Sequence, residues 1–374
     1  MEKLRILHKE QENDALLKRK IAELPDTTPY KRIVDQYFES ALNHGASTQQ
    51  RVREITKALR ALWVVKAGKS ETFTIFEDFA TFEGFLFQSP DYRGHYAHQF
   101  NVFLLGYYIL NKITQNDEGC RSVFFRGSSN PNFTWMLSST FHDMGYPIQQ
   151  LDDWFSKFLN MFLKVDVQYQ IEVEKVLTPL FFEYARYLSK EHAKQISGYS
   201  VSLPSEFEID WKFYNVLLTR LRKKDHGIIS ALLLMHSLLT QEEIKKFSGE
   251  GLEWIRQTFP HEIMPACHAI SIHHLAQEIQ TEDFRNNLRH HPYAFLLILC
   301  DVLQDWGRSI SQKDYSELVD INIDCSHHRP VISCNLQVNN KRKLEELDML
   351  ENKLSNNLLE VVIKQESGDR IRKI

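Results

Sequence analysis

The chain has 374 residues, of which 43% are hydrophobic and 25% are charged, and its formal net charge is -4. This length and composition predict a globular protein with a substantial core and exclude an intrinsically disordered chain. The nearly balanced charge argues against an extended nucleic-acid-binding surface, so we expect any bound phosphate to be held locally.

The cysteines and the N-terminus bear on the cellular compartment. The five cysteines show no Cys-x-x-Cys spacing, which favours reduced core thiols over a disulfide framework or a thiolate zinc site. The N-terminal residues MEKLRILHKEQENDALLKRK are charged throughout and lack the apolar region of a signal peptide. No apolar run is long enough to span a membrane. We expect a cytoplasmic protein with no membrane partner, and a homo-oligomer is left open.

Helical spacing of apolar residues dominates the first 70 residues. Ile33, Tyr37 and Phe38 recur three to four residues apart, as do later apolar residues of this segment. The prolines within residues 24–29 separate a polar first helix from the next one. We therefore predict an N-terminal helical segment over residues 1–70 that begins with a helical arm.

Residues 71–312 contain long apolar segments that are typical of buried helices. The clearest are FNVFLLGYYILN, FTWMLSSTFHDMG, HGIISALLLMHSLL, EIMPACHAISIHHLA and PYAFLLILCDVLQDWGR. Strand-like alternation is scarce between them, and the separating segments carry Gly, Asn and Pro. The pattern predicts a mainly α protein built on a helical bundle.

The last segment, residues 313–374, has a different periodicity. Val319, Ile321 and Ile323 alternate with polar residues, and a second alternating run spans residues 332–338. Leucines spaced over residues 344–358 predict a helix, and a short apolar run at 361–363 predicts a last strand. We expect a small C-terminal α+β appendage, which could serve as a dimerisation element or a lid.

Side chains with metal-ligand chemistry interrupt the apolar segments. They are His98, the pair His142-Asp143, His226, the pair His273-His274, and Asp301. A buried imidazole or carboxylate is costly without a partner, and a shared cation would compensate all of them together. Taken alone, each has a simpler interpretation, such as a hydrogen-bonded core histidine or a capped helix end. Their joint occurrence in the buried segments favours a metal site.

The order His98, His142-Asp143 and Asp301 resembles the HD-domain superfamily of metal-dependent phosphohydrolases, whose ligands lie on helices of an α-helical bundle. The resemblance covers roughly residues 70–310, and HDMGYP is similar to the HDxGxP-type turn of these proteins. The resemblance implies the HD-domain helical bundle as the fold of this segment.

The histidines between the pair and the last aspartate resemble those of the binuclear branch of the superfamily. This resemblance implies two divalent metal ions with Asp143 as the bridging and catalytic carboxylate. One ion would be bound by His98, His142 and Asp301, and the other by His226 and His273, with His274 replacing or joining His273. Mixed imidazole and carboxylate ligands favour manganese or iron, with zinc or magnesium as further options.

The implied activity is hydrolysis of a phosphoester or phosphoanhydride of a nucleotide by a metal-bridged hydroxide. Candidate substrates are a phosphodiester, including a cyclic nucleotide, and a deoxynucleoside triphosphate. The Gly- and His-rich signature of triphosphate-releasing members is absent from HDMGYPIQQLDDWF, which counts against the latter. One alternative is a di-iron oxygenase of the same fold that acts on a small polyol or phosphonate. Another is a non-catalytic module for nucleotide sensing or protein interaction.

Residues beside the ligands are candidates for acid-base catalysis and phosphate binding. His95 lies one helical turn before His98 and is either an acid-base group or a partly buried polar residue. Asp225 is expected to cap the helix that begins at His226, or to orient that ligand and assist catalysis. Four cations are candidate substrate contacts, with solvated helix-end charges as the alternative: Arg93, Lys223, Lys224 and Arg308.

Overall fold

A computed structural model describes most of the predicted helices and the C-terminal sheet. The described residues are 2–43, 48–67, 79, 81, 95–148, 156, 159–161, 177, 218–239, 259–273, 286–287, 291–304, 316–326, 329–338, 341–355, 358–365 and 371–373. The chain forms two compact units, which we call unit 1 (Met1–Thr140 and Leu275–Ile374) and unit 2 (Phe141–His274). The predicted division into residues 1–70, 71–312 and 313–374 stays a prediction, because the two units are defined by their internal contacts and do not test where separate domains begin.

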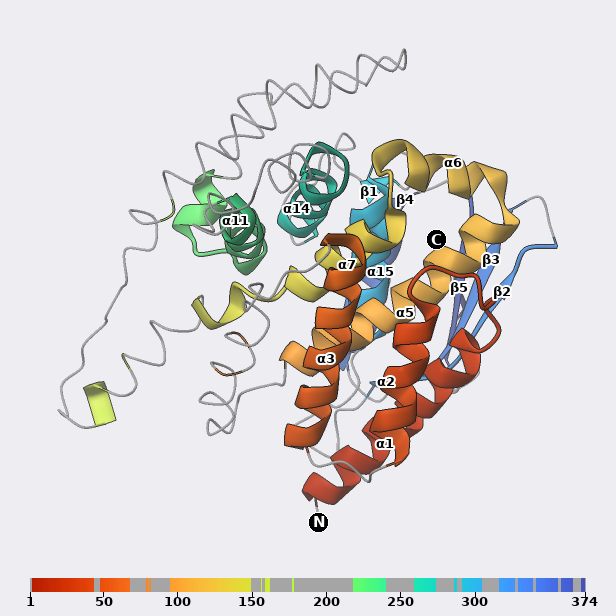
Figure 1. Ribbon diagram of the computed structural model, residues 1–374, viewed down its shortest axis with the longest axis horizontal. Helices are drawn as coiled ribbons and strands as arrows, with labels where there is room; N and C mark the ends of the chain where they lie inside the picture. Colours follow the sequence, from red (N-terminus) through yellow and green to blue (C-terminus); the bar gives the residue numbers. More distant parts are fainter. Residues whose placement is uncertain are drawn as a thin grey trace. The chain divides into compact units, whose positions relative to one another are not determined.

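Helix α5, His95–Asn116, is buried along nearly its whole length at the centre of unit 1. Its buried residues lie on every side of the helix, as expected for a helix surrounded by other elements. Five further helices of this unit lie around it, and α1, α3, α6 and α15 contact α5 directly (Figure 1). They are α1 (Glu2–Ile21), α2 (Lys31–Asn43), α3 (Thr48–Ala67), α6 (Glu118–Gly127) and α15 (Pro292–Leu303).

Helix α1 is packed into unit 1, so the predicted N-terminal arm is wrong. Leu17 and Ile21 are fully buried, and α1 contacts both α2 and α5. Asp14 accepts a hydrogen bond from the guanidinium of Arg51 on α3 at 3.0 Å, and both side chains are buried. A buried, hydrogen-bonded ion pair of this kind joins two helices whose sequences look too polar for a core.

Helix α7, Pro131–Phe141, lies against α5. Trp135 donates its indole N–H to the carbonyl of Phe103 at 2.9 Å, and Asn132 and Asn111 exchange two side-chain hydrogen bonds. Gly106 makes room for the indole, since a Cβ there would lie 2.8 Å from Trp135 Cη2 and closer still to Cζ2 and Cε2. These contacts fix α7 on the helix that carries His98.

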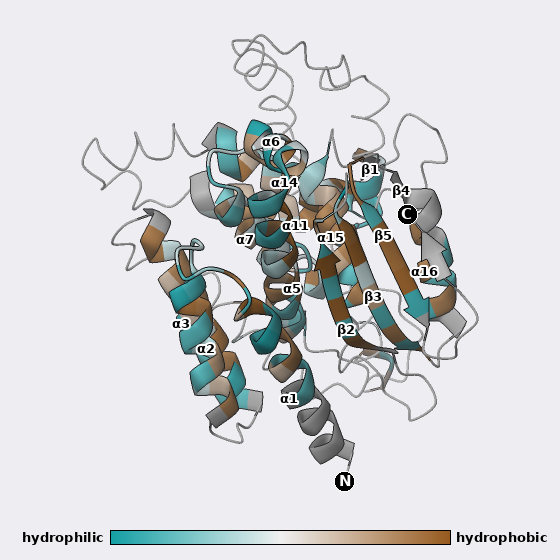
Figure 2. Ribbon diagram, turned by 90° about the vertical axis from the view of Figure 1, so that its right-hand side faces the viewer, coloured by the Kyte–Doolittle hydropathy of each residue, from teal (hydrophilic) through white to brown (hydrophobic). Residues whose placement is uncertain are grey.

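The C-terminal segment forms a four-stranded sheet in the order β2-β3-β5-β6. The pairs β2/β3 and β5/β6 are antiparallel, whereas β3 and β5 are parallel and are joined through helix α16. Hydrophobic residues run along β3 and β5 (Figure 2). The bounds are β2 Ser316–Asp324, β3 Val331–Val338, α16 Lys341–Lys353, β5 Glu360–Gln365 and β6 Ile371–Lys373, and a short parallel pair joins β1 (Asn286–Asn287) to β4 (Leu354–Ser355).

The α+β character of this segment is confirmed, with differences in detail. The helix ends at Lys353, before the predicted 358, because Leu354 already belongs to β4. Strand β6 was not predicted, because Ile371–Lys373 contains one apolar residue followed by two charged ones. Periodicity therefore identified the strands that have a buried face.

Unit 2 contains the helices α11, His226–Leu239, and α14, Met264–Ile272, which pack against each other. A short π-helix, η2 (Phe259–Ile263), leads directly into α14. The Cys267 thiol donates to the carbonyl of Ala231 at 3.5 Å across the α11–α14 contact. Together with unit 1, these elements confirm a mainly α protein that also contains a small four-stranded sheet. Among the described residues, none of the helices combines the length and apolarity needed to cross a bilayer.

The close approach of α5 and α7 can be tested at Gly106. We expect Gly106→Ala to lower the free energy of unfolding by about 2–3 kcal/mol, because the indole must leave its hydrogen bond to make room for the methyl group. Gly119→Ala is the matched control, since its Cβ would meet only the Asp117 carboxylate at 3.1 Å and Leu358 at 3.7 Å. Urea unfolding measures both, and a Gly106→Ala protein as stable as the wild type would contradict the packing.

Candidate metal centre

One carboxylate and three imidazoles form a buried cluster in unit 2, which we call the unit 2 cluster. Its members are His142, Asp143, His226 and His273, and each is at most 6% exposed. The ligand atoms of Asp143, His226 and His273 lie within 4.8 Å of one another. The ring of His142 stands edge-on to that of His273, with centroids 5.5 Å apart. This donor set could hold a metal ion.

The turn after α7 brings Asp143 to the first turn of α11. The backbone N–H of Gly145 donates to the hydroxyl of Ser230 at 2.7 Å. A Cβ on Gly145 would lie 2.5 Å from the carbonyl oxygen of His226 and 2.8 Å from Cβ of Ile229. Glycine is therefore required here for close approach, which explains the Gly in the HDMGYP segment.

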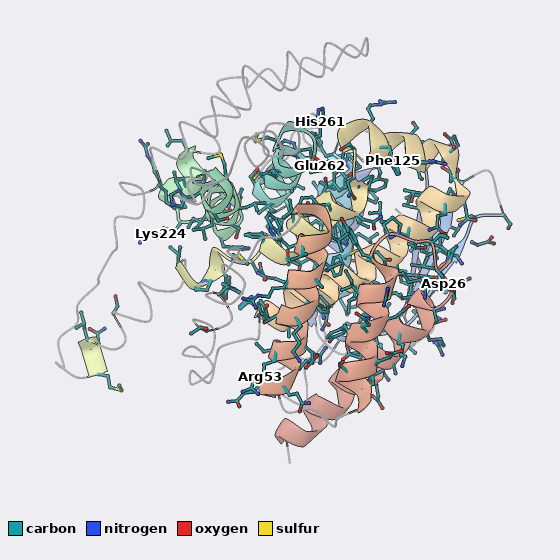
Figure 3. All side chains as sticks on the ribbon, in the orientation of Figure 1. Asp26, Arg53, Phe125, Lys224, His261 and Glu262 are labelled. Atoms are coloured by element: carbon teal, nitrogen blue, oxygen red, sulfur yellow. The ribbon has the colours of Figure 1, made fainter. Side chains whose placement is uncertain are left out.

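Helix α11 begins at His226 and is capped by Asp225. The Asp225 carboxylate accepts the backbone N–H of Ile228 at 3.2 Å and forms an ion pair with Arg220 at 3.3 Å. The predicted N-cap is thus confirmed, and its catalytic role stays a prediction. Lys224, which is labelled in Figure 3, lies just before the cap. Its backbone is left-handed, with φ of 56°, and its side chain is half-buried. Burial lowers the pKa of this lysine.

His273 is the C-cap residue of α14. Its Nδ1 donates to the carbonyl of Ile270, which leaves Nε2 as the nitrogen suited to bind a metal. Gly227 allows α11 to approach this point, since a Cβ there would lie 2.9 Å from the Ile270 oxygen and 3.1 Å from Cε1 of His273. The alternative ligand His274 lies outside the described residues.

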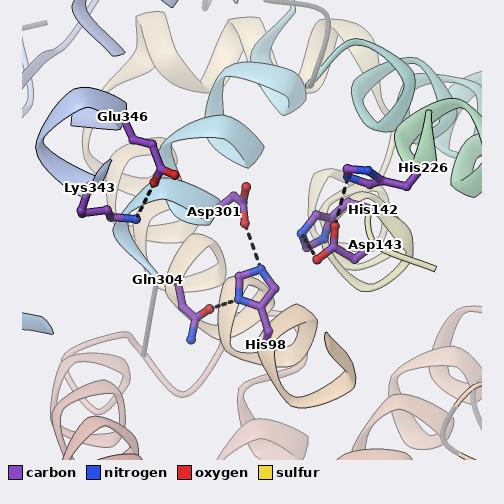
Figure 4. Close-up of polar contacts among 8 residues, drawn as sticks. All are labelled: His98, His142, Asp143, His226, Asp301, Gln304, Lys343 and Glu346. Atoms are coloured by element: carbon purple, nitrogen blue, oxygen red, sulfur yellow. Dashed lines mark hydrogen bonds and ion pairs between the residues drawn. The ribbon is translucent and has the colours of Figure 1, made fainter. Parts of the chain in front are cut away.

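The two oxygens of Asp143 face different histidines. Oδ2 is 3.6 Å from Nε2 of His142, and Oδ1 is 3.4 Å from Nε2 of His226 (Figure 4). Metal–ligand bonds of about 2.0–2.2 Å place neighbouring donors of one ion roughly 3–3.5 Å apart. The distance from each Asp143 oxygen to the histidine that it faces is therefore close to the distance between two donors of one metal ion.

His98 and Asp301 are neighbours in unit 1. Nε2 of His98, on α5, is 2.9 Å from Oδ1 of Asp301, on α15 (Figure 4). The opposite ring nitrogen, Nδ1, hydrogen-bonds to Oε1 of Gln304, whose side chain is fully buried. Sequence reasoning missed Gln304. Its available signal was an amide three residues after Asp301, which places it on the same side of the helix end.

Of the remaining predicted site residues, the structure describes His95 and Lys223. His95 is the first residue of α5 and is buried, whereas Lys223 is exposed, as a solvated helix-end charge would be. Arg93 and Arg308 lie outside the described residues. The acid-base role of His95 and the phosphate-binding role of the cations stay predictions.

All five cysteines are free thiols, as predicted, and four of them are buried. Cys300 precedes Asp301 directly, and burial raises its pKa well above the usual value. Burial likewise raises the pKa of Cys334, to about 12. The groups of side chains that could hold a metal ion in the described part of the chain contain histidine and aspartate and no cysteine.

Comparison with known proteins gives no relative: no family model, no curated protein and no solved structure matches the chain. The similarity to the HD-domain superfamily thus rests on the motif residues themselves. What the structure adds is a buried His/Asp cluster that could hold a metal ion.

The role of Gly227 gives a test of this cluster. We expect Gly227→Ala to weaken metal binding by at least about tenfold, because the methyl group meets a backbone carbonyl and displaces the group that orients His273. Ser237→Ala, near the other end of α11, is the control. Competition with a chromophoric chelator gives the affinity of each variant. Wild-type affinity in Gly227→Ala would show that the close approach of α11 and α14 does not position the ligand.

Proposed function

We propose that the protein is a metal-dependent phosphohydrolase of the HD type that acts on a nucleotide. The observation that carries the proposal is the orientation of Asp143, whose two oxygens face different imidazoles at 3.4 and 3.6 Å. A carboxylate presented in this way is suited to bridge two cations, and two-metal sites are widely used for phosphoryl chemistry.

The size of the donor set supports the participation of His98 and Asp301. Four side chains of the unit 2 cluster are too few for two ions that each take four to six ligands, even with one shared carboxylate and bound water. The 2.9 Å spacing of His98 and Asp301 suits neighbouring ligands of one ion. We therefore propose that this pair joins His142 and Asp143 on one ion, while His226 and His273 bind the other.

The donor chemistry narrows the choice of metal. Neutral imidazoles and carboxylates without thiolates suit first-row transition metals of intermediate softness, whereas calcium and magnesium prefer oxygen ligands alone. Manganese or iron is our choice. When bound, the two ions would activate water as a nucleophile and offset negative charge at phosphorus.

The side chains around the cluster would position the metal ions and the substrate and would exclude water from the site. Asp143 and its imidazoles are buried, so few waters compete for the ligands. Tyr146 borders the cluster with its ring edge-on to His226, at 5.6 Å between centroids, and is half-buried. Lys224 is held half-buried two residues before His226, where a cation could contact a substrate phosphate.

Elemental analysis coupled to a substrate screen tests the activity. Protein purified from manganese- and iron-supplemented cultures is expected to contain up to two ions per chain and to hydrolyse a phosphodiester or a deoxynucleoside triphosphate from a nucleotide panel. Oxygen consumption by the iron form with a polyol or phosphonate, without phosphoester hydrolysis, would instead support the di-iron oxygenase. Absence of bound metal would contradict both.

Substitutions on one helix separate ligand loss from general damage. We expect His226→Ala and Asp143→Ala to lose at least one metal equivalent and to lower kcat/KM roughly a thousandfold, because they remove a ligand and the bridging group. His236→Ala is the matched control, since His236 lies on the same helix α11 and is exposed. Full metal content in Asp143→Ala would contradict the bridging role.

A further inference from the structure

We propose that Gln304 is a positioning residue that selects the tautomer of His98 and aims its Nε2 at the metal. The inference rests on the proposed metal site but adds to it a residue outside the ligand set. Gln304 would hold the proton on Nδ1 of His98. With a metal ion bound, the lone pair of Nε2 and the carboxylate of Asp301 would both be directed at the ion.

The contacts of His98 place an acceptor at each ring nitrogen. Nδ1 hydrogen-bonds to Oε1 of Gln304, and Nε2 lies 2.9 Å from Oδ1 of Asp301 (Figure 4). A neutral imidazole carries one proton, for which the Asp301 carboxylate competes at Nε2 in the metal-free protein. A metal ion at Nε2 requires that proton to lie on Nδ1, where an acceptor stabilises it. The amide oxygen of Gln304 is such an acceptor, and it cannot itself be protonated near neutral pH.

The position of Gln304 on α15 explains how it is held. It is the C-cap residue, with φ of -100° and ψ of 77°, and its backbone N–H donates to the carbonyl of Cys300 at 2.8 Å. The chain leaves the helix at this residue, and its side chain is fully buried. One helix end therefore supplies both Asp301 and the group that orients the neighbouring ligand, His98.

Burial of the amide argues for a specific role. A buried amide without a hydrogen bond costs roughly 1–3 kcal/mol, so a leucine of similar size would be preferred if the position only filled space. Groups that accept the second N–H of a metal-binding histidine typically change metal affinity by about 10–100-fold. We expect an effect of this size at Gln304.

Three variants test the proposal. Gln304→Leu removes the acceptor, Gln304→Glu keeps an acceptor at the same position, and Gln115→Leu is a control in which another glutamine of unit 1 loses its hydrogen bond to Thr28. Manganese affinity is measured by competition with a chelator. Nitrogen NMR of histidine-labelled, metal-free protein at pH 8, above the ordinary imidazole pKa of about 6.5, reports the tautomer of His98.

The expected result is a 10–100-fold loss of manganese affinity in Gln304→Leu, with recovery in Gln304→Glu and no change in Gln115→Leu. The His98 signal should show a protonated Nδ1 in the wild type. In Gln304→Leu the proton should lie on Nε2, beside the Asp301 carboxylate, which leaves Nδ1 unprotonated. Unchanged affinity and tautomer in Gln304→Leu would overturn the inference. Equal losses in Gln304→Leu and Gln304→Glu, with equal falls in the urea midpoint, would also overturn it and indicate a purely structural residue.

The NMR measurement separates this inference from the proposed function. If the wild type binds no manganese, the phosphohydrolase proposal fails. The tautomer shift between wild type and Gln304→Leu would still show whether Gln304 orients His98.

Discussion

The Asp143 carboxylate is buried among imidazoles, and much of unit 2 is arranged around this constraint. A carboxylate that is 6% exposed loses most of its hydration, which is costly unless cations or hydrogen-bond donors replace the water. The chain meets this requirement through very close backbone approaches. Gly145 touches the first turn of α11, and Gly227 on that turn touches the end of α14. Two glycines thus determine how near three ligand-bearing segments can come.

Buried polar groups in unit 1 are also compensated, in this case by side chains on other helices. His98 is placed between a carboxylate and an amide, and Asp14 is compensated by Arg51. In both cases the partners come from helices distant in sequence, so each polar contact also fixes the packing of two helices. Because a broken buried pair is far more costly than an exposed one, these contacts restrict the helices to one arrangement.

The sequence predicted the long buried helices α5 and α15 because each carries a long apolar run, such as VFLLGYYIL in α5 and AFLLILC in α15. It also predicted β2 and β3. Alternate residues are buried in β3, whereas a register shift between Leu318 and Asp320 in β2 buries Leu318 and leaves the predicted inward residue Val319 exposed. Prediction from the sequence failed where a polar side chain is satisfied by a distant partner. The polar character of α1, to which Asp14 contributes, suggested an arm, and Gln304 was not singled out. Such pairings depend on the register between helices, which local patterns do not contain. The candidate metal-binding residues were recognisable because several unusual side chains occur in one order.

The placement of the unit 2 cluster at helix ends has an electrostatic consequence. Asp143 lies beside the N-terminus of α11, where the helix dipole favours negative charge, whereas His142 and His273 follow the C-termini of α7 and α14, where it favours positive charge. A carboxylate near the positive end and a cation near two negative ends are therefore stabilised together. The same residues placed in helix interiors would lack this field. The ends of α7 and α14 thus add a favourable contribution for a cation held by His142 and His273, beside that of the side-chain donors.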